Sequence, residues 1–175
     1  KKDFSNVLDL GTGSGIIIIT LLLENTLATG IGVDIDFRAL KVAKKNSNIF
    51  AVEKRIDFVH SDWCEQIDEK FDLVISNPPW EDGVVTKPAD HAFYDPGFRL
   101  MDTLLDGLPG HLKPGGRCLL VFGNVQAIKR LQSESEKRGF AVKVLDDRDP
   151  QAVAVVVETP MQKKERNGAP VSFRT

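Results

Sequence analysis

Short apolar runs alternate along the chain with segments whose apolar residues recur at helical spacing. Runs rich in Val, Ile and Leu, bounded by glycine, proline or aspartate, predict strands. Seven runs fit this description: 6–10, 30–35, 56–62, 71–77, 117–123, 140–147 and 152–158. Helices are predicted between them, over 14–25, 37–49, 97–113 and 125–139. The third of these helices is expected to be interrupted at 107–110, and a turn is expected at 114–116.

The helix predicted over 37–49 has the clearest start and the clearest division of faces. Asp36 stands directly before it and is a suitable N-cap residue. Leu40, Val42 and Ala43 are expected to face the protein interior, whereas the lysines at 41, 44 and 45 are expected to face water.

Alternating strands and helices predict an α/β fold, a doubly wound and mostly parallel sheet of seven strands with helices on both faces. The last two strands have no helix between them, so we expect an antiparallel hairpin at one edge, with its turn around Asp149 and Pro150. In such sheets, ligands bind beyond the carboxyl ends of the strands, where the strand order reverses.

The length of 175 residues suits one domain over 1–160, followed by a polar, basic tail over 161–175. A net charge of −2 gives no global positive field, which weakens a nucleic-acid-binding interpretation. No apolar run approaches the roughly 20 residues of a membrane-spanning helix, and no signal-peptide pattern opens the chain. We therefore expect a cytoplasmic protein that does not bind membranes.

The cysteines and histidines show no metal-binding spacing. Cys64 and Cys118 are far apart in the sequence, and His60, His91 and His111 form no i, i+4 pair. We expect the cysteines to be small apolar core residues in a reducing compartment, and we expect no metal site.

A glycine-rich stretch, "DLGTGSG" (9–15), follows the first predicted strand directly. Its spacing is GxGxG and departs from the GxGxxG of dinucleotide-binding turns, which argues against a nicotinamide-dependent oxidoreductase. Asp34 ends the second strand, where a carboxylate can accept both hydroxyl groups of a ribose. Asp62 ends the third strand and can accept from an adenine amino group, while Trp63 or an apolar neighbour covers the ring. Together these residues predict a nucleoside-shaped cleft.

This pattern resembles the class I S-adenosylmethionine-dependent methyltransferases over 7–158, including the terminal hairpin. The resemblance implies that S-adenosylmethionine is the cofactor and that Ile35 packs on its base, beside the roles of Asp34 and Asp62. It also implies which residues cradle the methionine moiety: Asp9, Gly11, Thr12, Gly13 and Gly15. Members of that group usually carry an N-terminal helix or substrate domain, and we expect this segment to be absent or truncated here.

The stretch "NPPW", Asn77 to Trp80, ends the fourth predicted strand and resembles a signature of methyltransferases that modify planar nitrogens. An amide or ring-conjugated NH₂ is a poor nucleophile because its lone pair is delocalised. The Asn77 side-chain oxygen and the Pro78 carbonyl can each accept one N–H and aim the lone pair at the methyl group. Pro78 and Pro79 make the turn rigid, and Trp80 can stack on the acceptor.

The segment 81–96 is expected to determine specificity, because loops of this length are usually functional or disordered. His91, Tyr94, Asp95 and Arg99 are candidate substrate contacts, and "FYDPGFR" is similar to HemK-like glutamine methyltransferases. We therefore expect N-methylation of a macromolecular acceptor, with a protein glutamine favoured. Two alternatives stay open: methylation of an exocyclic amino group of adenine or guanine in RNA or DNA, and an inactive methyltransferase-fold binding partner.

Overall fold

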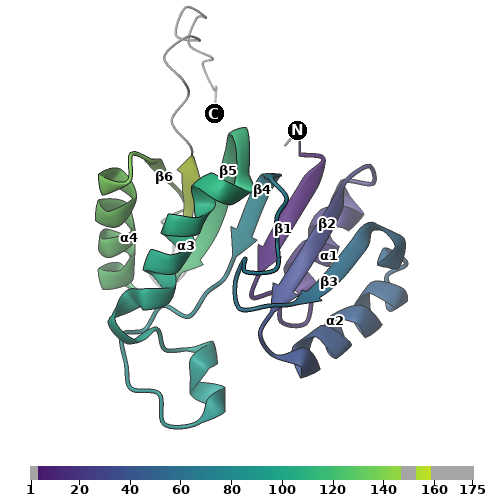
Figure 1. Ribbon diagram of the computed structural model, residues 1–175, viewed down its shortest axis with the longest axis horizontal. Coiled ribbons are helices and arrows are strands. Elements are labelled where there is room, and N and C mark those ends of the chain that lie inside the picture. The colour runs from purple at the N-terminus through teal and green to yellow at the C-terminus, as the bar shows by residue number, and fades with distance from the viewer. Residues whose placement is uncertain (1–3, 147–152, 159–175) are drawn as a thin grey trace, which may run out of the picture.

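The computed structural model describes residues 4–146 and 153–158, which form one sheet with helices on both faces (Figure 1). The strands are β1 (Asn6–Leu10), β2 (Thr29–Asp34), β3 (Ile56–His60), β4 (Phe71–Ser76), β5 (Leu112–Phe122), β6 (Ala141–Asp146) and β7 (Val153–Glu158). Their order across the sheet is β3-β2-β1-β4-β5-β7-β6. The first five strands pair in parallel, and β7 is antiparallel to both β5 and β6. The predicted fold class is therefore confirmed; the turn at 149–150 and the segment 161–175 lie outside the described residues.

Two separate cores cover the two faces of this sheet. The principal helices are α1 (Ile16–Glu24), α2 (Phe37–Ile49), α3 (Arg99–His111) and α4 (Val125–Lys137). Side chains alternate between the faces of a strand, so Val7 lies in the core beneath α1, whereas Leu8 and Leu10 lie in the core with α3 and α4. Figure 1 shows α3 and α4 beside each other and away from α1 and α2. Among the residues described, no helix has the length and apolar character that crossing a membrane requires.

Local sequence signals set the ends of the helices. The Asp36 side chain accepts a hydrogen bond from the Arg38 backbone N–H at 2.8 Å and caps α2 as predicted. Asn124 caps α4 in the same way. Gly139 follows α4 with φ of 80°, and the N–H of Phe140 returns to the carbonyl of Ser135 at 3.0 Å. This is the arrangement that closes a helix with a left-handed glycine.

Three local predictions are wrong. Helix α3 continues through 107–110 to His111, because Leu104, Leu105 and Leu108 are buried and packing outweighs the weak helix propensity of this stretch. The residues 114–116 belong to β5, which starts at Leu112 and shifts register against β4 between Phe71 and Leu73. Val42 is 49% exposed, because it lies on the opposite side of α2 from Leu40 and Ala43.

The side chain of His111 shows how the end of α3 is held. Its Nδ1 lies 2.8 Å from the Gly107 carbonyl oxygen, and its Nε2 lies 2.9 Å from the Ile67 carbonyl oxygen. These contacts join the last turn of α3 to the connection between β3 and β4.

Candidate active site

The glycine turn and the NPPW stretch lie next to each other at the point where the strand order reverses. From β1 the chain continues to β2 on one side and later returns as β4 on the other. Leu10 and Ser76, the last residues of β1 and β4, are paired in the sheet, and the Ser76 hydroxyl donates to the Leu10 carbonyl oxygen at 2.7 Å. Gly11 and Asn77 therefore leave the sheet from neighbouring strand ends.

The turn over 11–15 has a backbone that favours glycine. Gly11, Gly13 and Gly15 have φ of 69°, 56° and 78°, in the left-handed region that other residues rarely adopt. The Thr12 N–H donates to the Val33 carbonyl oxygen at 2.8 Å, which fastens the turn to β2. Gly15 starts α1 without a side-chain cap. The turn thus presents backbone, free of side chains at its glycines, next to a helix N-terminus.

Asp34 lies at the end of β2, as predicted, and joins that end to the glycine turn. Its Oδ2 accepts from the Gly13 N–H at 2.8 Å and its Oδ1 from the Asp36 N–H at 2.8 Å. Each carboxylate oxygen retains acceptor capacity after one hydrogen bond, so the group can still bind hydroxyl groups. The next residue, Ile35, is 64% exposed and offers an apolar surface beside the acid.

Asp62 and Trp63 follow the end of β3. Asp62 is exposed, and Trp63 is half-buried against the core shared with α3, with φ of 47°. Positive φ is rare for a bulky residue and indicates a conformation imposed by its surroundings. Both residues line a cavity of about 470 Å³ whose other wall is α3, including Leu100, Thr103 and Leu104. The cavity lies between this turn and α3, and it shares Asp62 and Trp63 with the predicted nucleoside cleft.

Asp9 is a buried acid of the site, with 1% of its surface exposed. The Thr12 hydroxyl donates to its Oδ2 at 2.7 Å, whereas its Oδ1 is buried without a hydrogen-bond partner among the described residues. Burial raises the pKa of Asp9 to about 7, and the charge of Asp34 also raises it. The hydrogen bond from Thr12 and the backbone N–H of Ile18 act in the opposite direction.

In the NPPW stretch, the side-chain amide of Asn77 is exposed, whereas the residues that follow it are buried or half-buried. Asn77 is exposed, and within the described part of the chain its side chain makes no hydrogen bond. Pro78 is buried and Pro79 is half-buried. Trp80 is half-buried and packs against the core shared with α3 and α4. One part of the indole is therefore held by the core, and the amide of Asn77 is available to a ligand.

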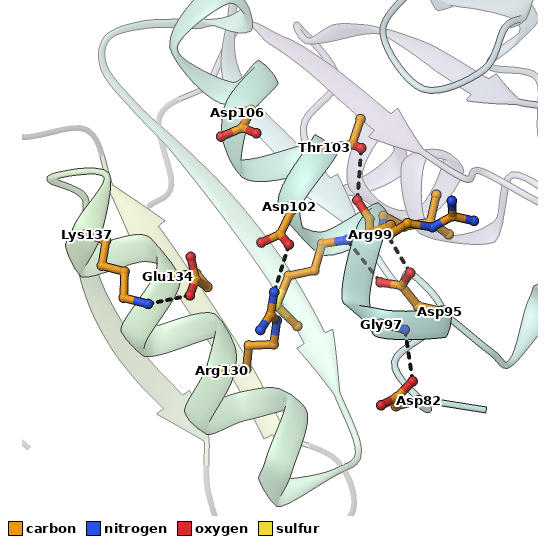
Figure 2. A network of polar contacts seen from close by, with 12 residues as sticks. Asp82, Asp95, Gly97, Arg99, Asp102, Thr103, Asp106, Arg130, Glu134 and Lys137 are labelled. Carbon is orange, nitrogen blue, oxygen red and sulfur yellow. Dashed lines mark hydrogen bonds and ion pairs between the residues drawn. The ribbon is translucent and has the colours of Figure 1, made fainter.

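Backbone hydrogen bonds join the two ends of the segment that follows Trp80. The Glu81 N–H donates to the Phe93 carbonyl oxygen at 3.2 Å, and the Asp95 N–H donates to the Glu81 carbonyl oxygen at 2.8 Å. Asp82 accepts from the Gly97 N–H at 2.9 Å (Figure 2). Exposed His91 and Arg99 and half-buried Tyr94, the candidate substrate contacts, belong to this segment or to the start of α3.

Asp95 has a role that sequence reasoning missed. It is buried, and its two oxygens accept from the N–H groups of Leu100 and Met101 at 2.9 and 3.0 Å, so it caps α3 (Figure 2). Burial raises the pKa of this carboxyl group. The signal was present in the sequence, because Asp-Pro-Gly before an apolar-periodic run is typical of a helix start.

Ion pairs hold α3 against α4 at the side of the site. Arg130 of α4 donates to Asp102 of α3 at 2.7 Å (Figure 2). Arg138, which follows α4, contacts Asp106 of α3 and Glu134 of α4 at 2.7 Å each. These ion pairs join the two helices and indicate a structural role, although the Asp102 Oδ1 and the Arg130 Nε accept or donate no hydrogen bond among the described residues. Cys118 is buried in the adjoining core and Cys64 packs against it; both are free thiols, and burial raises the pKa of Cys64 to about 11.

Comparison with known proteins shows the family. The family model described as the methyltransferase small domain matches residues 1–147. The chain belongs to the methyltransferase small domain family. The methyltransferase family predicted from the sequence is therefore confirmed.

Relatives in this family include proteins of known name. The chain is 38% identical over 160 residues to a release factor glutamine methyltransferase of Cereibacter sphaeroides, with 85% of this chain and 57% of that protein covered. It is 40% identical over 141 residues to a bifunctional methyltransferase of Rickettsia prowazekii, with 71% and 26% covered. The chain thus spans about half of the first relative and about a quarter of the second. A methyltransferase structure from Pyrococcus furiosus shares the fold, with a TM-score of 0.74, 16% identity and 92% of this chain and 77% of that chain covered.

Proposed function

We propose that the chain is an S-adenosylmethionine-dependent methyltransferase that acts on a planar amide nitrogen, with a protein glutamine as the favoured acceptor. One observation carries the proposal: the Leu10–Ser76 pair brings the glycine turn and the NPPW stretch to neighbouring strand ends. A cofactor held by the first motif and an acceptor held by the second would then meet at the same place. The family and the names of the relatives support the same reaction class.

The residues of the site suit this cofactor. The turn over 11–15 supplies a backbone cradle, Asp34 has acceptor capacity for the ribose, and Ile35 offers an exposed apolar surface for the base. Asp62 is exposed just after the end of β3, where it can accept from the adenine amino group. When bound, the cofactor supplies a methyl group activated by a positive sulfonium, so the protein needs no strong base.

The side of the site that would bind the methyl acceptor carries two oxygen atoms that can accept hydrogen bonds. The Asn77 oxygen is free to accept one N–H of the acceptor amide, and the carbonyl of Pro78 is held rigidly to accept the other. Two such bonds would hold the nitrogen with its lone pair toward the methyl group. Good alignment of two reactants contributes up to about 7–11 kcal/mol to lowering a barrier.

Transfer of labelled methyl groups tests both the reaction and the acceptor. The protein, with labelled S-adenosylmethionine, is incubated with a purified bacterial release factor and, in parallel, with total RNA and DNA. We expect label in the release factor, located on a glutamine by peptide mass spectrometry. Label found only in nucleic acid would refute the glutamine acceptor and favour a base amino group. Tight cofactor binding without transfer to either class would favour the inactive binding partner.

Substitution of Asn77 separates its role from cofactor binding. We expect Asn77→Ala to lower kcat by about a hundredfold to a thousandfold, as the loss of one transition-state hydrogen bond does elsewhere. The Kd of S-adenosylhomocysteine should stay within about twofold, because Asn77 lies on the acceptor side. Asn48→Ala, at an exposed position near the end of α2, is the matched control and should change neither quantity. Equal losses of transfer and of cofactor affinity in Asn77→Ala would contradict this assignment.

A further inference from the structure

One buried oxygen atom of the site makes no hydrogen bond to the described residues. The Oδ1 of Asp9 is buried and lacks a hydrogen-bond partner among the described residues, although the other oxygen of the same carboxyl group accepts from Thr12. Leaving an ionised oxygen buried and unpaired costs several kcal/mol. Natural structures rarely keep such an atom unless a ligand, a water molecule or a proton compensates it.

Among the residues that the structure describes, no positive side chain contributes to the pKa of Asp9. Strand β1 is flanked by β2 and β4 and covered by α1. The acid facing Asp9 from β2 is Asp34, which repels a second negative charge. The charged residue of α1, Glu24, and that of β4, Asp72, lie at the far ends of those elements, and Asp72 pairs with Lys113. Within the described part of the chain, the groups that favour the ionised form of Asp9 are the Thr12 hydroxyl and the Ile18 N–H.

We propose that Asp9 is a proton-exchanging anchor, neutral in much of the free protein near neutral pH and ionised once the ammonium group of the cofactor's methionine end lies at the glycine turn. This inference rests on the function proposed above. The incoming positive charge supplies the compensation that the free protein lacks, and the proton of Asp9 leaves to the buffer. Binding of the amino-acid end is thereby coupled to the release of one proton.

The number of protons released follows from the titration of Asp9. With a pKa of about 7 in the free protein, about 0.9 proton is bound at pH 6 and about 0.1 at pH 8. If the bound form is ionised at both pH values, these are the protons released on binding. The same linkage makes the Kd about tenfold weaker at pH 6 than at pH 8.

Isothermal titration calorimetry with S-adenosylhomocysteine measures this coupling without turnover. Titrations at each pH in two buffers with different ionisation enthalpies give the protons released per ligand bound. We expect about 0.9 at pH 6 and about 0.1 at pH 8. Methylthioadenosine, which keeps the nucleoside but lacks the amino-acid end, should bind with almost no proton release at either pH.

Two variants identify the group that gives up the proton. Asp9→Asn should bind S-adenosylhomocysteine with no pH-dependent release. Asp95→Asn is the matched control, because Asp95 is also a buried acid with a raised pKa but caps α3, and it should leave the release unchanged. If Asp9→Asn does not fold, the protons released by the wild-type protein on binding S-adenosylhomocysteine and methylthioadenosine still test the inference.

Each remaining outcome is decisive. Tight binding of S-adenosylhomocysteine with less than about 0.2 proton released at pH 6, or release that persists in Asp9→Asn, would overturn the inference and leave the proposed function intact. Equal release with methylthioadenosine would also overturn it, because the amino-acid end would not be the trigger. Failure of S-adenosylhomocysteine to bind at either pH would overturn the proposed function, and the inference with it.

Discussion

Asp9 should make the folded protein less stable as the pH rises through neutrality. The pKa of its carboxyl group is raised from 3.8 to about 7, mainly by burial. A group with a raised folded-state pKa contributes stability that is fully present below its unfolded value and is lost as the pH rises through the folded value. The relevant window is therefore about pH 4 to pH 7, and Asp9→Asn removes this dependence because an amide does not titrate.

The size of the effect follows from the same shift. About three pKa units correspond to about 4 kcal/mol in total. Between pH 5 and pH 8, the part of this stabilisation that disappears is about 2–3 kcal/mol. For a protein of this size, 1 kcal/mol moves Tm by about 2–4 °C. The Tm of Asp9→Asn minus that of the wild type should then rise by about 5–10 °C from pH 5 to pH 8.

Thermal unfolding followed by circular dichroism at pH 5, 6, 7 and 8 measures this difference for the ligand-free proteins. Asp36→Asn is the control, because hydrogen bonds from Arg38 lower the pKa of Asp36 and keep it ionised throughout this range. Its Tm difference from the wild type should not vary with pH. A difference for Asp9→Asn that stays constant within about 2 °C across the four pH values would refute the reasoning, because Asp9 would then titrate alike in the folded and unfolded chain.

Three further predictions test other parts of the structure. Asp34→Ala removes the predicted ribose acceptor and should weaken the Kd of S-adenosylhomocysteine about tenfold to a hundredfold by calorimetry; an unchanged Kd would exclude Asp34 from the site. A Cβ on Gly83 would overlap the Tyr94 ring, so Gly83→Ala should lower the free energy of unfolding in urea by about 1–3 kcal/mol, and Tyr94→Ala should restore part of it; additive losses would contradict this contact. Leu105 is fully buried, so Leu105→Ala should cost about 2–5 kcal/mol in the same assay, and a loss below about 1 kcal/mol would show that the site collapses around the cavity.

The sequence predicted the sheet well because its signals are local. Apolar runs bounded by glycine or aspartate locate each strand, and the Asp36 cap locates the start of α2. Packing and hydrogen bonds between distant segments could not be predicted from the sequence. Pro109 and its neighbouring glycines read as a break, yet buried leucines and the two contacts of His111 keep α3 intact to its end. The inward placement of Val42 was an error of helical phase, since residues 40, 43 and 47 form the buried face.

The positions of the candidate-site residues in the fold were predictable because these residues lie at the ends of strands or directly after them. Acids and glycines at the ends of parallel strands must gather at one edge of the sheet, as Asp34 and Gly11 do. The environment of each residue was not predictable, since it depends on contacts between distant segments. Burial of Asp9 beneath the glycine turn and the capping of α3 by Asp95 are both of this kind. The roles of Asn77 and Trp80 in transfer stay predictions.

The clamp at the base of the segment after Trp80 has a consequence for how such a protein can diversify. Glu81 is bridged to Tyr94, and the Asp95 N–H returns to Glu81, so the chain is fastened before and after residues 84–92. Doubling the length of a flexible loop costs only about 0.6 kcal/mol. Residues 84–92, which include the 3-10 helix Pro88–Ala92, lie between these two fastened points, so we expect changes in their length to leave Asn77 and α3 in place. Recognition of a new acceptor could then evolve through changes in residues 84–92, while the NPPW stretch stays unchanged.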